Sequence, residues 1–204
     1  MNIEILKNFI VFEGLDGAGT STQSRLLSKE IKSSFLTFEP TDSKIGGLIR
    51  DCLKKKINFD TLTLAFLFSA DRRDHLYKKN GIIDRCKQNQ IVISDRYLFS
   101  SLAYQSIDYP FDQILELNKY FPLPEVVFFL DTSLETCKDR INNRGDIEEL
   151  YEGYALQKKI LDNYLQTFYF YEKLGLKIVK LDGNLSKDEL FDMEIKYLKD
   201  NKII

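Results

Sequence analysis

The chain contains 204 residues, with 29 Lys and Arg against 31 Asp and Glu, and its formal net charge is -2 at pH 7. Hydrophobic residues make up 44% of it, which is typical of a packed globular protein and too high for a disordered chain. A net charge this close to zero argues against a protein that coats nucleic acid or an anionic membrane. Because His75 is the only histidine, a metal site built from several histidines is excluded.

Nothing in the composition indicates export or membrane insertion. The three cysteines, Cys52, Cys86 and Cys137, are odd in number and far apart, which favours reduced thiols. The start of the chain carries Glu4 and has no long apolar core, so it does not resemble a signal peptide. No stretch reaches the roughly 18 apolar residues that span a bilayer. We therefore expect a soluble cytoplasmic protein that binds neither nucleic acid nor membranes.

Short apolar runs alternate along the chain with longer segments of helical spacing. The apolar runs predict buried strands of a parallel sheet at residues 9–12, 35–38, 91–93, 126–130 and 177–181. Helical spacing is present in residues 20–31, 62–72, 114–117, 151–174 and 190–198. This alternation indicates the α/β class. Because no linker rich in Pro, Gly or Ser divides the chain, residues 1–204 are predicted to form a single domain.

A glycine-rich segment follows the first predicted strand and leads into the first predicted helix. It runs Gly14-Leu15-Asp16-Gly17-Ala18-Gly19-Thr20-Ser21 and fits the phosphate-loop pattern G-x-x-x-x-G-K-[ST], except that Thr20 replaces the lysine. Glycines let the backbone aim its N–H groups at a phosphate, and the helix N-terminus adds a positive dipole. The hydroxyl of Ser21 is expected to meet Mg²⁺. The segment is therefore a candidate ATP-binding loop.

A charged pair follows the strand predicted at residues 91–93. Asp95 and Arg96 lie at its carboxyl end, which is where open α/β sheets bind ligands. Asp95 is a candidate to hold Mg²⁺ through water, and Arg96 can form a bidentate contact with a phosphate. A local salt bridge is the better explanation of an isolated Asp-Arg pair. A phosphate loop in the same sheet favours a functional role here.

Together these segments resemble the thymidylate kinase family of nucleoside monophosphate kinases. The matching stretches are residues 12–19, 68–72 and 95–105, followed by Asp131, Arg140 and Arg144. The resemblance implies a P-loop NTPase fold, with a five-stranded parallel sheet flanked by helices in three α/β/α layers. It also implies that phosphate passes from ATP to dTMP with Mg²⁺. A homodimer formed through helices that include residues 61–72 and 100–104 is implied as well.

The resemblance further implies which residues bind dTMP. Asp16 is expected to approach the sugar 3′-hydroxyl, Phe68 to stack on thymine and Arg72 to donate to its carbonyl edge. Phe68 and Arg72 are four residues apart and so share one face of a helix. The other expected contacts are Tyr97, which crowds the 2′ position, and Ser101, Tyr104 and Gln105, which line the base and sugar pocket. Core packing of Phe68 and an ion pair of Arg72 with Asp71 or Asp74 are the alternative interpretations.

Arginines are expected to act on the phosphates. The resemblance implies that Arg96 binds phosphate and that Arg140 and Arg144 bracket adenine and the transferring phosphoryl group. The catalytic residues are thus predicted to be Asp95, Arg96 and Arg144, with Arg144 in a lid at about residues 141–153. Arg50 is a weaker candidate for the acceptor phosphate, because an exposed helix arginine explains it equally well.

Two features depart from the family pattern. Thr20 removes the ammonium group that bridges donor phosphates, and such a loss commonly costs a few kcal/mol in the transition state. The lid is also acidic after Arg144. We therefore expect Arg96, Arg140 and Arg144 to carry more of the phosphate charge than usual. Two alternatives stay open: a catalytically impaired nucleotide-binding protein of the same fold, and a kinase for another nucleotide or deoxynucleotide.

Overall fold

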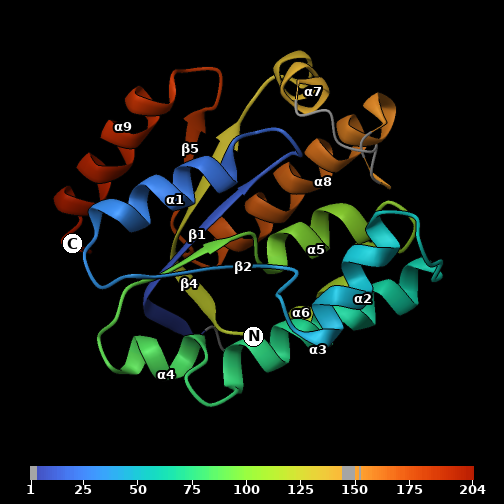
Figure 1. Ribbon diagram of the computed structural model, residues 1–204, viewed down its shortest axis with the longest axis horizontal. Helices are drawn as coiled ribbons and strands as arrows, with labels where there is room; N and C mark the ends of the chain where they lie inside the picture. Colours follow the sequence, from blue (N-terminus) through green and yellow to red (C-terminus); the bar gives the residue numbers. More distant parts are fainter. Residues whose placement is uncertain (1–3, 144–149, 152) are drawn as a thin grey trace.

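A parallel sheet of five strands forms the centre of the protein, in the order β2-β3-β1-β4-β5 (Figure 1). The computed structural model describes residues 4–143, 150–151 and 153–204. The strands are β1 (Ile5–Gly14), β2 (Phe35–Phe38), β3 (Val92–Asp95), β4 (Leu123–Asp131) and β5 (Ile178–Asp182). The predicted sheet and its flanking helices are confirmed. Strands β1 and β4 are longer than their apolar runs, because Ile5 and Leu6 also pair with Leu123 and Pro124 before a shift in register.

Helices follow or connect the strands and pack on the sheet. They are α1 (Thr20–Glu30), α2 (Lys44–Leu53), α3 (Thr61–Tyr77), α4 (Ile82–Lys87), α5 (Leu98–Gln105), α6 (Phe111–Asn118), α7 (Leu134–Asn142), α8 (Tyr154–Lys173) and α9 (Lys187–Asp200). Helix α1 packs against α9, and α5 packs against α8 (Figure 1). The spacing of apolar residues did not predict α2, α4, α5 or α7, since helices of six to ten residues span few turns and show a weak period.

The residues before each helix explain where several of them begin. Side chains of Ser43, Asp60, Ser133 and Ser186 accept hydrogen bonds from first-turn amides of α2, α3, α7 and α9, respectively. Helices α1 and α5 have no such cap of their own. Both of these helices begin at the carboxyl edge of the sheet, so their first amides are free to meet other groups there.

The core is rich in aromatic side chains on both sides of β4. Phe128 stacks on Phe12 with ring centroids 5.3 Å apart, and Phe129 meets Phe168 of α8 at 4.7 Å. Aromatic pairs of this kind add to the free energy of apolar burial. In the part of the chain that the structure describes, no helix combines the length and apolar character needed to cross a membrane.

Glu194 is an exception among the buried residues of α9. It lies between Leu190 and Leu198 on the buried face of the helix, and its side chain is fully buried. Neither carboxyl oxygen has a hydrogen-bond partner among the described residues. Burial without a partner raises the pKa of Glu194 to about 8.

We expect Glu194→Gln to stabilise the protein more at pH 9 than at pH 5. The pKa of this carboxyl rises from an ordinary value near 4.5 to about 8 on folding, so the folded state binds the proton more tightly. The free energy of unfolding therefore falls as the pH rises through this window, and the uncharged amide avoids that loss. Thermal unfolding of both proteins at pH 5, 7 and 9 measures the difference. A Tm difference that is the same at every pH would contradict this account.

Candidate active site

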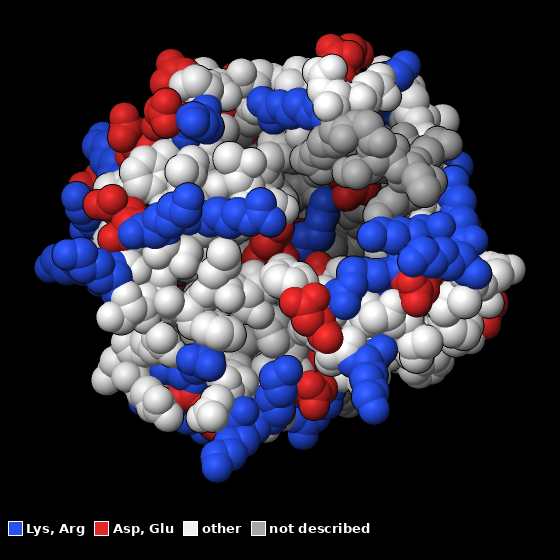
Figure 2. Space-filling model, viewed as in Figure 1, with Lys and Arg blue, Asp and Glu red and all other residues white. Residues whose placement is uncertain are grey.

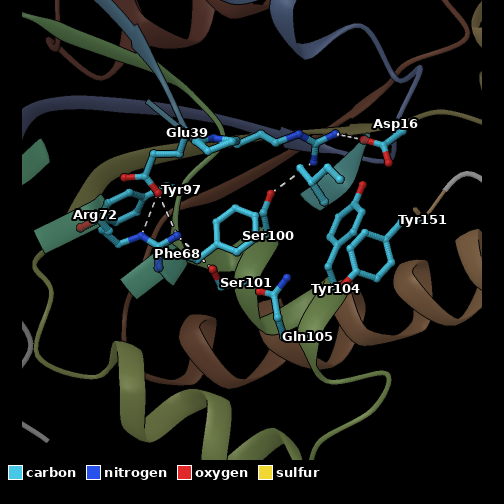
Figure 3. A pocket seen from close by; sticks show the side chains of 13 residues that line it. Asp16, Glu39, Phe68, Arg72, Tyr97, Ser100, Ser101, Tyr104, Gln105 and Tyr151 are labelled. Atoms are coloured by element: carbon cyan, nitrogen blue, oxygen red, sulfur yellow. Dashed lines mark hydrogen bonds and ion pairs between the residues drawn. The ribbon is translucent and has the colours of Figure 1, made fainter. Parts of the chain in front are cut away.

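The loop predicted to bind phosphate separates two cavities at the carboxyl edge of the sheet. The first, here called the aromatic cavity, lies on the α3 and α5 side (Figure 3). Its lining consists of Asp16, Glu39, Pro40, Leu53, Phe68, Arg72, Arg96, Tyr97, Ser100, Ser101, Tyr104, Gln105 and Tyr151. The second, the loop cavity, is lined by Gly17, Ala18, Gly19, Thr22, Gln23, Arg140, Asn143, Leu185, Lys187 and Leu190. One loop therefore contributes its Asp16 to one cavity and its glycines to the other.

The backbone of this loop requires glycine at two positions. Gly17 has φ +84°, and a Cβ there would lie 2.5 Å from the carbonyl oxygen of Cys137 in α7. Gly19 has φ +107° and is the N-cap of α1, where it offers no side chain to the first amides of the helix. Those N–H groups, together with the positive end of the helix dipole, form a cradle for an anion. Thr20 is buried and adds no positive charge to the cradle.

Ser21 and Asp95, the two residues that the sequence analysis assigned to Mg²⁺, meet beside the cradle. The Ser21 hydroxyl donates a hydrogen bond to Oδ2 of Asp95, while Oδ1 of Asp95 is buried without a hydrogen-bond partner among the described residues. Hydroxyl and carboxylate oxygens are ligands that suit Mg²⁺. Within the described ranges no three His, Cys, Asp or Glu side chains group together as a metal site. The pair therefore fits an ion that takes its other ligands from water and phosphate.

Arg96 lies between the loop and the aromatic cavity. Its backbone is in the left-handed region, with φ 71°, which turns the side chain back toward the loop. Nη1 donates to the carbonyl oxygen of Gly14 at 2.7 Å, and Nη2 donates to Oδ1 of Asp16 at 2.6 Å. Gln157 of α8 donates to the other oxygen of Asp16 at 3.3 Å. The predicted residues Asp16 and Arg96 are thus brought together as an ion pair at the cavity wall.

Arg72 and Phe68 enter the aromatic cavity from one face of α3 (Figure 3). The guanidinium of Arg72 is buried and pairs with Glu39 at 2.8 Å, not with Asp71 or Asp74. It also donates to Ser101 at 3.0 Å and to Asn118. With most of its N–H groups occupied in this way, Arg72 is held rigidly as a donor at the cavity wall.

Glu39 and His75 form a layer behind Arg72. Nδ1 of His75 lies 3.2 Å from the second oxygen of Glu39, and Nε2 lies 2.6 Å from the hydroxyl of Thr37. His75 is buried and does not line either cavity. It therefore orients Glu39 and takes no direct part in the site.

The α5 residues of the aromatic cavity differ in what they offer a ligand. The hydroxyl of Tyr97 donates to the carbonyl oxygen of Pro122 at 2.8 Å, so only the ring of Tyr97 lines the cavity. Tyr104 packs edge-on against Tyr151, with ring centroids 5.3 Å apart. Oε1 of Gln105 is buried and has no hydrogen-bond partner among the described residues. Gln105 thus leaves an unused acceptor at the wall.

The remaining predicted arginines are placed differently from one another. Arg140 lines the loop cavity and donates to the carbonyl oxygens of Ala18 at 3.0 Å and Gly183 at 3.1 Å. Arg50 lines neither cavity; it donates to the carbonyl oxygens of Pro40, at 2.9 Å, and Thr41. The guanidinium of Arg50 thus holds the loop after β2, and its assignment to the acceptor phosphate stays a prediction. Arg144 and most of the predicted lid lie outside the described residues.

Several residues of the site were not predicted from the sequence. Glu39, Ser100 and Tyr151 line the aromatic cavity, and Ser100 connects Arg96 to the buried Glu13. Glu13 and Ser100 lie within the segments that carried the resemblance, so their position next to predicted residues was an available signal. Tyr151 lies near the end of the predicted lid and reaches the cavity through tertiary packing, edge-on against Tyr104 of α5.

Comparisons with known proteins agree with this geometry. The family model described as thymidylate kinase matches residues 12–193. A putative thymidylate kinase of Treponema pallidum is 41% identical over 203 residues, which cover 97% of this chain and 98% of that protein. A probable thymidylate kinase of Methanocaldococcus jannaschii is 36% identical, covering 94% of this chain and 95% of that protein.

A solved structure gives the same result. The thymidylate kinase of Candida albicans superposes with a TM-score of 0.83 at 27% sequence identity, over 97% of this chain and 93% of that one. The matched region includes the loop, both cavities and most of the helices that surround them. The chain belongs to the thymidylate kinase family.

Proposed function

We propose that this kinase transfers the γ-phosphoryl group of ATP to the 5′-phosphate of dTMP, giving ADP and dTDP. The observation that carries the proposal is the shared loop, whose glycines line one cavity and whose Asp16 lines the other. ATP in the loop cavity and dTMP in the aromatic cavity would place their phosphates on the two sides of Arg96. The reaction needs such an arrangement, because phosphoryl transfer depends mainly on positioning and on neutralising charge.

The aromatic cavity suits a thymine base. Phe68 offers a ring face for stacking, and Arg72 can only donate, so it favours a carbonyl oxygen at the base edge. The unused acceptor of Gln105 fits the N3–H group that lies next to that carbonyl. The ring of Tyr97 forms the wall assigned to the 2′ position, and Asp16 is assigned to the 3′-hydroxyl. Cytosine has the opposite pattern, with an amino group and an N3 acceptor.

The chain's own groups are each assigned a task at the phosphates. The amides at the start of α1 bind the donor phosphates, Arg96 binds the acceptor phosphate and holds it in line, and Arg140 fixes the loop. Ser21 and Asp95 would hold Mg²⁺, which neutralises charge on the donor phosphates when it is bound. Arg144 is assigned to the transferring phosphoryl group. The kinase thus acts by orientation and electrostatics, without a covalent intermediate.

We also propose a single cytoplasmic domain with a lid at about residues 141–153, working as a homodimer. Each of the three cysteines is buried and makes no disulfide, which suits a reducing compartment. One side of α3 supports the dimer. Phe66, Ala70, Arg73 and Tyr77 recur at helical spacing along it and are all exposed, Phe66 by 54% and Tyr77 by 46%. A continuous exposed stripe of this kind is a common protein contact surface.

The acceptor assignment predicts an order of substrates in a coupled assay of ADP release. We expect dTMP to give the highest kcat/KM and dCMP to fall at least about 100-fold below it, because Arg72 and Gln105 would face the wrong groups. UMP and AMP should also give a low kcat/KM. Because dUMP lacks only the methyl group of dTMP, its kcat/KM should lie nearer to that of dTMP. The related Candida albicans enzyme is described as having broad substrate specificity, so the full panel matters.

Two results of that panel would contradict the assignment. A preference for UMP over dTMP would remove the role given to the Tyr97 ring. Tight dTMP binding in calorimetry without turnover would favour a nucleotide-binding protein with impaired catalysis.

The missing loop lysine predicts a coupling between Thr20 and Arg144. We expect Arg144→Ala to lower kcat by at least about 100-fold, the order seen when one preorganised donor is lost. In a Thr20→Lys background the same change should cost less, because the new ammonium shares the phosphate charge. Steady-state kinetics of the two single variants and the double variant measure this. Near wild-type turnover of Arg144→Ala, or weaker ATP binding by Thr20→Lys, would show that the loop does not depend on Arg144 in this way.

The dimer proposal predicts that Phe66→Glu produces monomers. A charge in the centre of the exposed α3 stripe would have to be buried in the proposed interface, at a high free-energy cost. Analytical ultracentrifugation of wild type and variant at micromolar concentration gives the mass. Tyr120→Glu is a matched control, because Tyr120 is more exposed than Phe66 and lies outside α3. A monomeric wild type, or two variants with the same mass as wild type, would contradict the interface.

A further inference from the structure

Glu13 is a buried carboxylate directly behind the predicted phosphate-binding arginine. It is the second-to-last residue of β1, its side chain is fully buried, and it does not line either cavity. Oε1 accepts from the backbone N–H of Tyr97 at 2.9 Å and of Ser100 at 3.3 Å. Oε2 accepts from the hydroxyls of Ser100 at 2.6 Å and Tyr164 at 2.9 Å. Four donors thus converge on this side chain.

Two of these hydrogen bonds supply the cap that α5 lacks. Tyr97 is the N-cap residue of α5 and Ser100 is in its first turn, and no side chain of α5 caps them. A carboxylate at a helix N-terminus also meets the positive end of the dipole. Because Tyr97 follows Arg96 directly, the bond to its N–H fixes the chain where Arg96 holds φ 71°. Glu13 therefore stabilises the uncommon backbone conformation that aims Arg96.

The other two hydrogen bonds lead to the Arg96 guanidinium. Nη1 of Arg96 donates to the Ser100 hydroxyl at 3.2 Å and to the Tyr164 hydroxyl at 3.1 Å. The two hydroxyls also lie 2.8 Å from each other, but an ionised Glu13 accepts the hydrogen of each, so both oxygens can accept from Arg96. Arg96 and Glu13 have no direct ion pair; the two hydroxyls connect them.

We propose that Glu13 is a positioning residue for Arg96: its carboxylate takes the hydroxyl hydrogens of Ser100 and Tyr164 and thereby presents both oxygens to the guanidinium. This inference rests on the proposed function, because Arg96 is the group assigned to the acceptor phosphate. It adds a residue that touches neither substrate. The position of Arg96 matters more in this chain than in a kinase with lysine in the phosphate loop, because Thr20 brings no positive charge to the phosphates.

The ionised form of Glu13 is the one that can do this. A protonated carboxyl would donate to one hydroxyl and reverse its hydrogen bond. Burial raises the pKa of Glu13 to about 7, and the charge of Arg96 and the bonds from Ser100 and Tyr164 oppose that rise. The other titratable groups around it are Tyr104 of α5 and Asp16 of the loop, both reached through Arg96. Activity that depends on Glu13 should therefore rise as the pH passes about 7.

A double-mutant cycle tests the proposal. We expect Glu13→Gln to lower kcat/KM for dTMP by about 100-fold, the order found for one misplaced preorganised donor. Arg96→Ala should cost at least as much, and adding Glu13→Gln to Arg96→Ala should change kcat/KM by less than about 3-fold, since the two residues act as one unit. An equal loss from Glu13→Gln in both backgrounds would overturn the proposal.

Three further measurements separate positioning from folding. Tyr164→Phe keeps Glu13 but removes one connecting hydroxyl, so it should also lower kcat/KM. In the Arg96→Ala background, Tyr164→Phe should change kcat/KM by less than 10-fold. Ionisation of the substrate phosphate changes kcat/KM with pH in both proteins. Wild type should show an additional rise in kcat/KM near pH 7, and Glu13→Gln should lack it. Glu194→Gln, which changes an equally buried glutamate away from both cavities, should leave kcat/KM and its pH profile unchanged. A pH profile that Glu13→Gln leaves unchanged would contradict the mechanism.

Binding data keep this test distinct from the test of the reaction. If wild type binds dTMP but shows no turnover, the proposed function fails. The positioning role is then measured by calorimetry, where Glu13→Gln should weaken dTMP binding about 10-fold or more with Arg96 present and have little effect without it. Unchanged dTMP affinity in Glu13→Gln would overturn the role of Glu13 independently of catalysis.

Discussion

The pairing of β1 with β3 is the constraint on which the site depends. The two strands are parallel and in register, with Phe12 opposite Asp95, so β3 ends two residues before β1 does. The backbone N–H of Arg96 then donates to the carbonyl oxygen of Phe12 at 2.9 Å. The phosphate loop therefore leaves β1 close to the point where the Asp-Arg pair ends β3. A shift of this register by one residue would turn each side chain to the opposite face of the sheet and separate Ser21 from Asp95.

The arginines of the site are balanced by acids before any substrate binds. Arg72 pairs with Glu39 and Arg96 with Asp16, while Glu13 lies one layer behind Arg96. Figure 2 accordingly shows acidic and basic side chains next to one another on this face, not a field of a single sign. The positive and negative charges thus nearly balance around the site, as they do over the whole chain. A planar guanidinium that already has one anionic partner can still offer its other N–H groups to a phosphate or a base.

Much of the fold and part of the site could be predicted from the sequence, for identifiable reasons. The five strands were visible because a sheet covered on both faces needs continuous apolar runs. Asp16, Phe68, Arg72 and Arg96 were found because their spacing is local and matches known motifs. Glu39 and Tyr151 were not found, since they reach the cavity through tertiary packing. Arg50 stays a predicted phosphate ligand; in the structure its guanidinium donates to carbonyl oxygens of the loop after β2.

The residues that are hardest to predict from the sequence are those behind the ligand-facing arginines, here called the second layer. The charge of the arginines explains why this layer must exist. A buried guanidinium without an anionic or hydrogen-bonded neighbour is too costly to keep, so each arginine that faces a ligand needs acceptors behind it. Those acceptors are scattered in sequence, as with Asn118 behind Arg72 and Tyr164 behind Arg96. Sequence motifs identify the groups that touch substrate. The direction in which those groups point is set by residues such as Glu13 that touch only other side chains, and for a reaction that works by orientation this second layer is part of the chemistry.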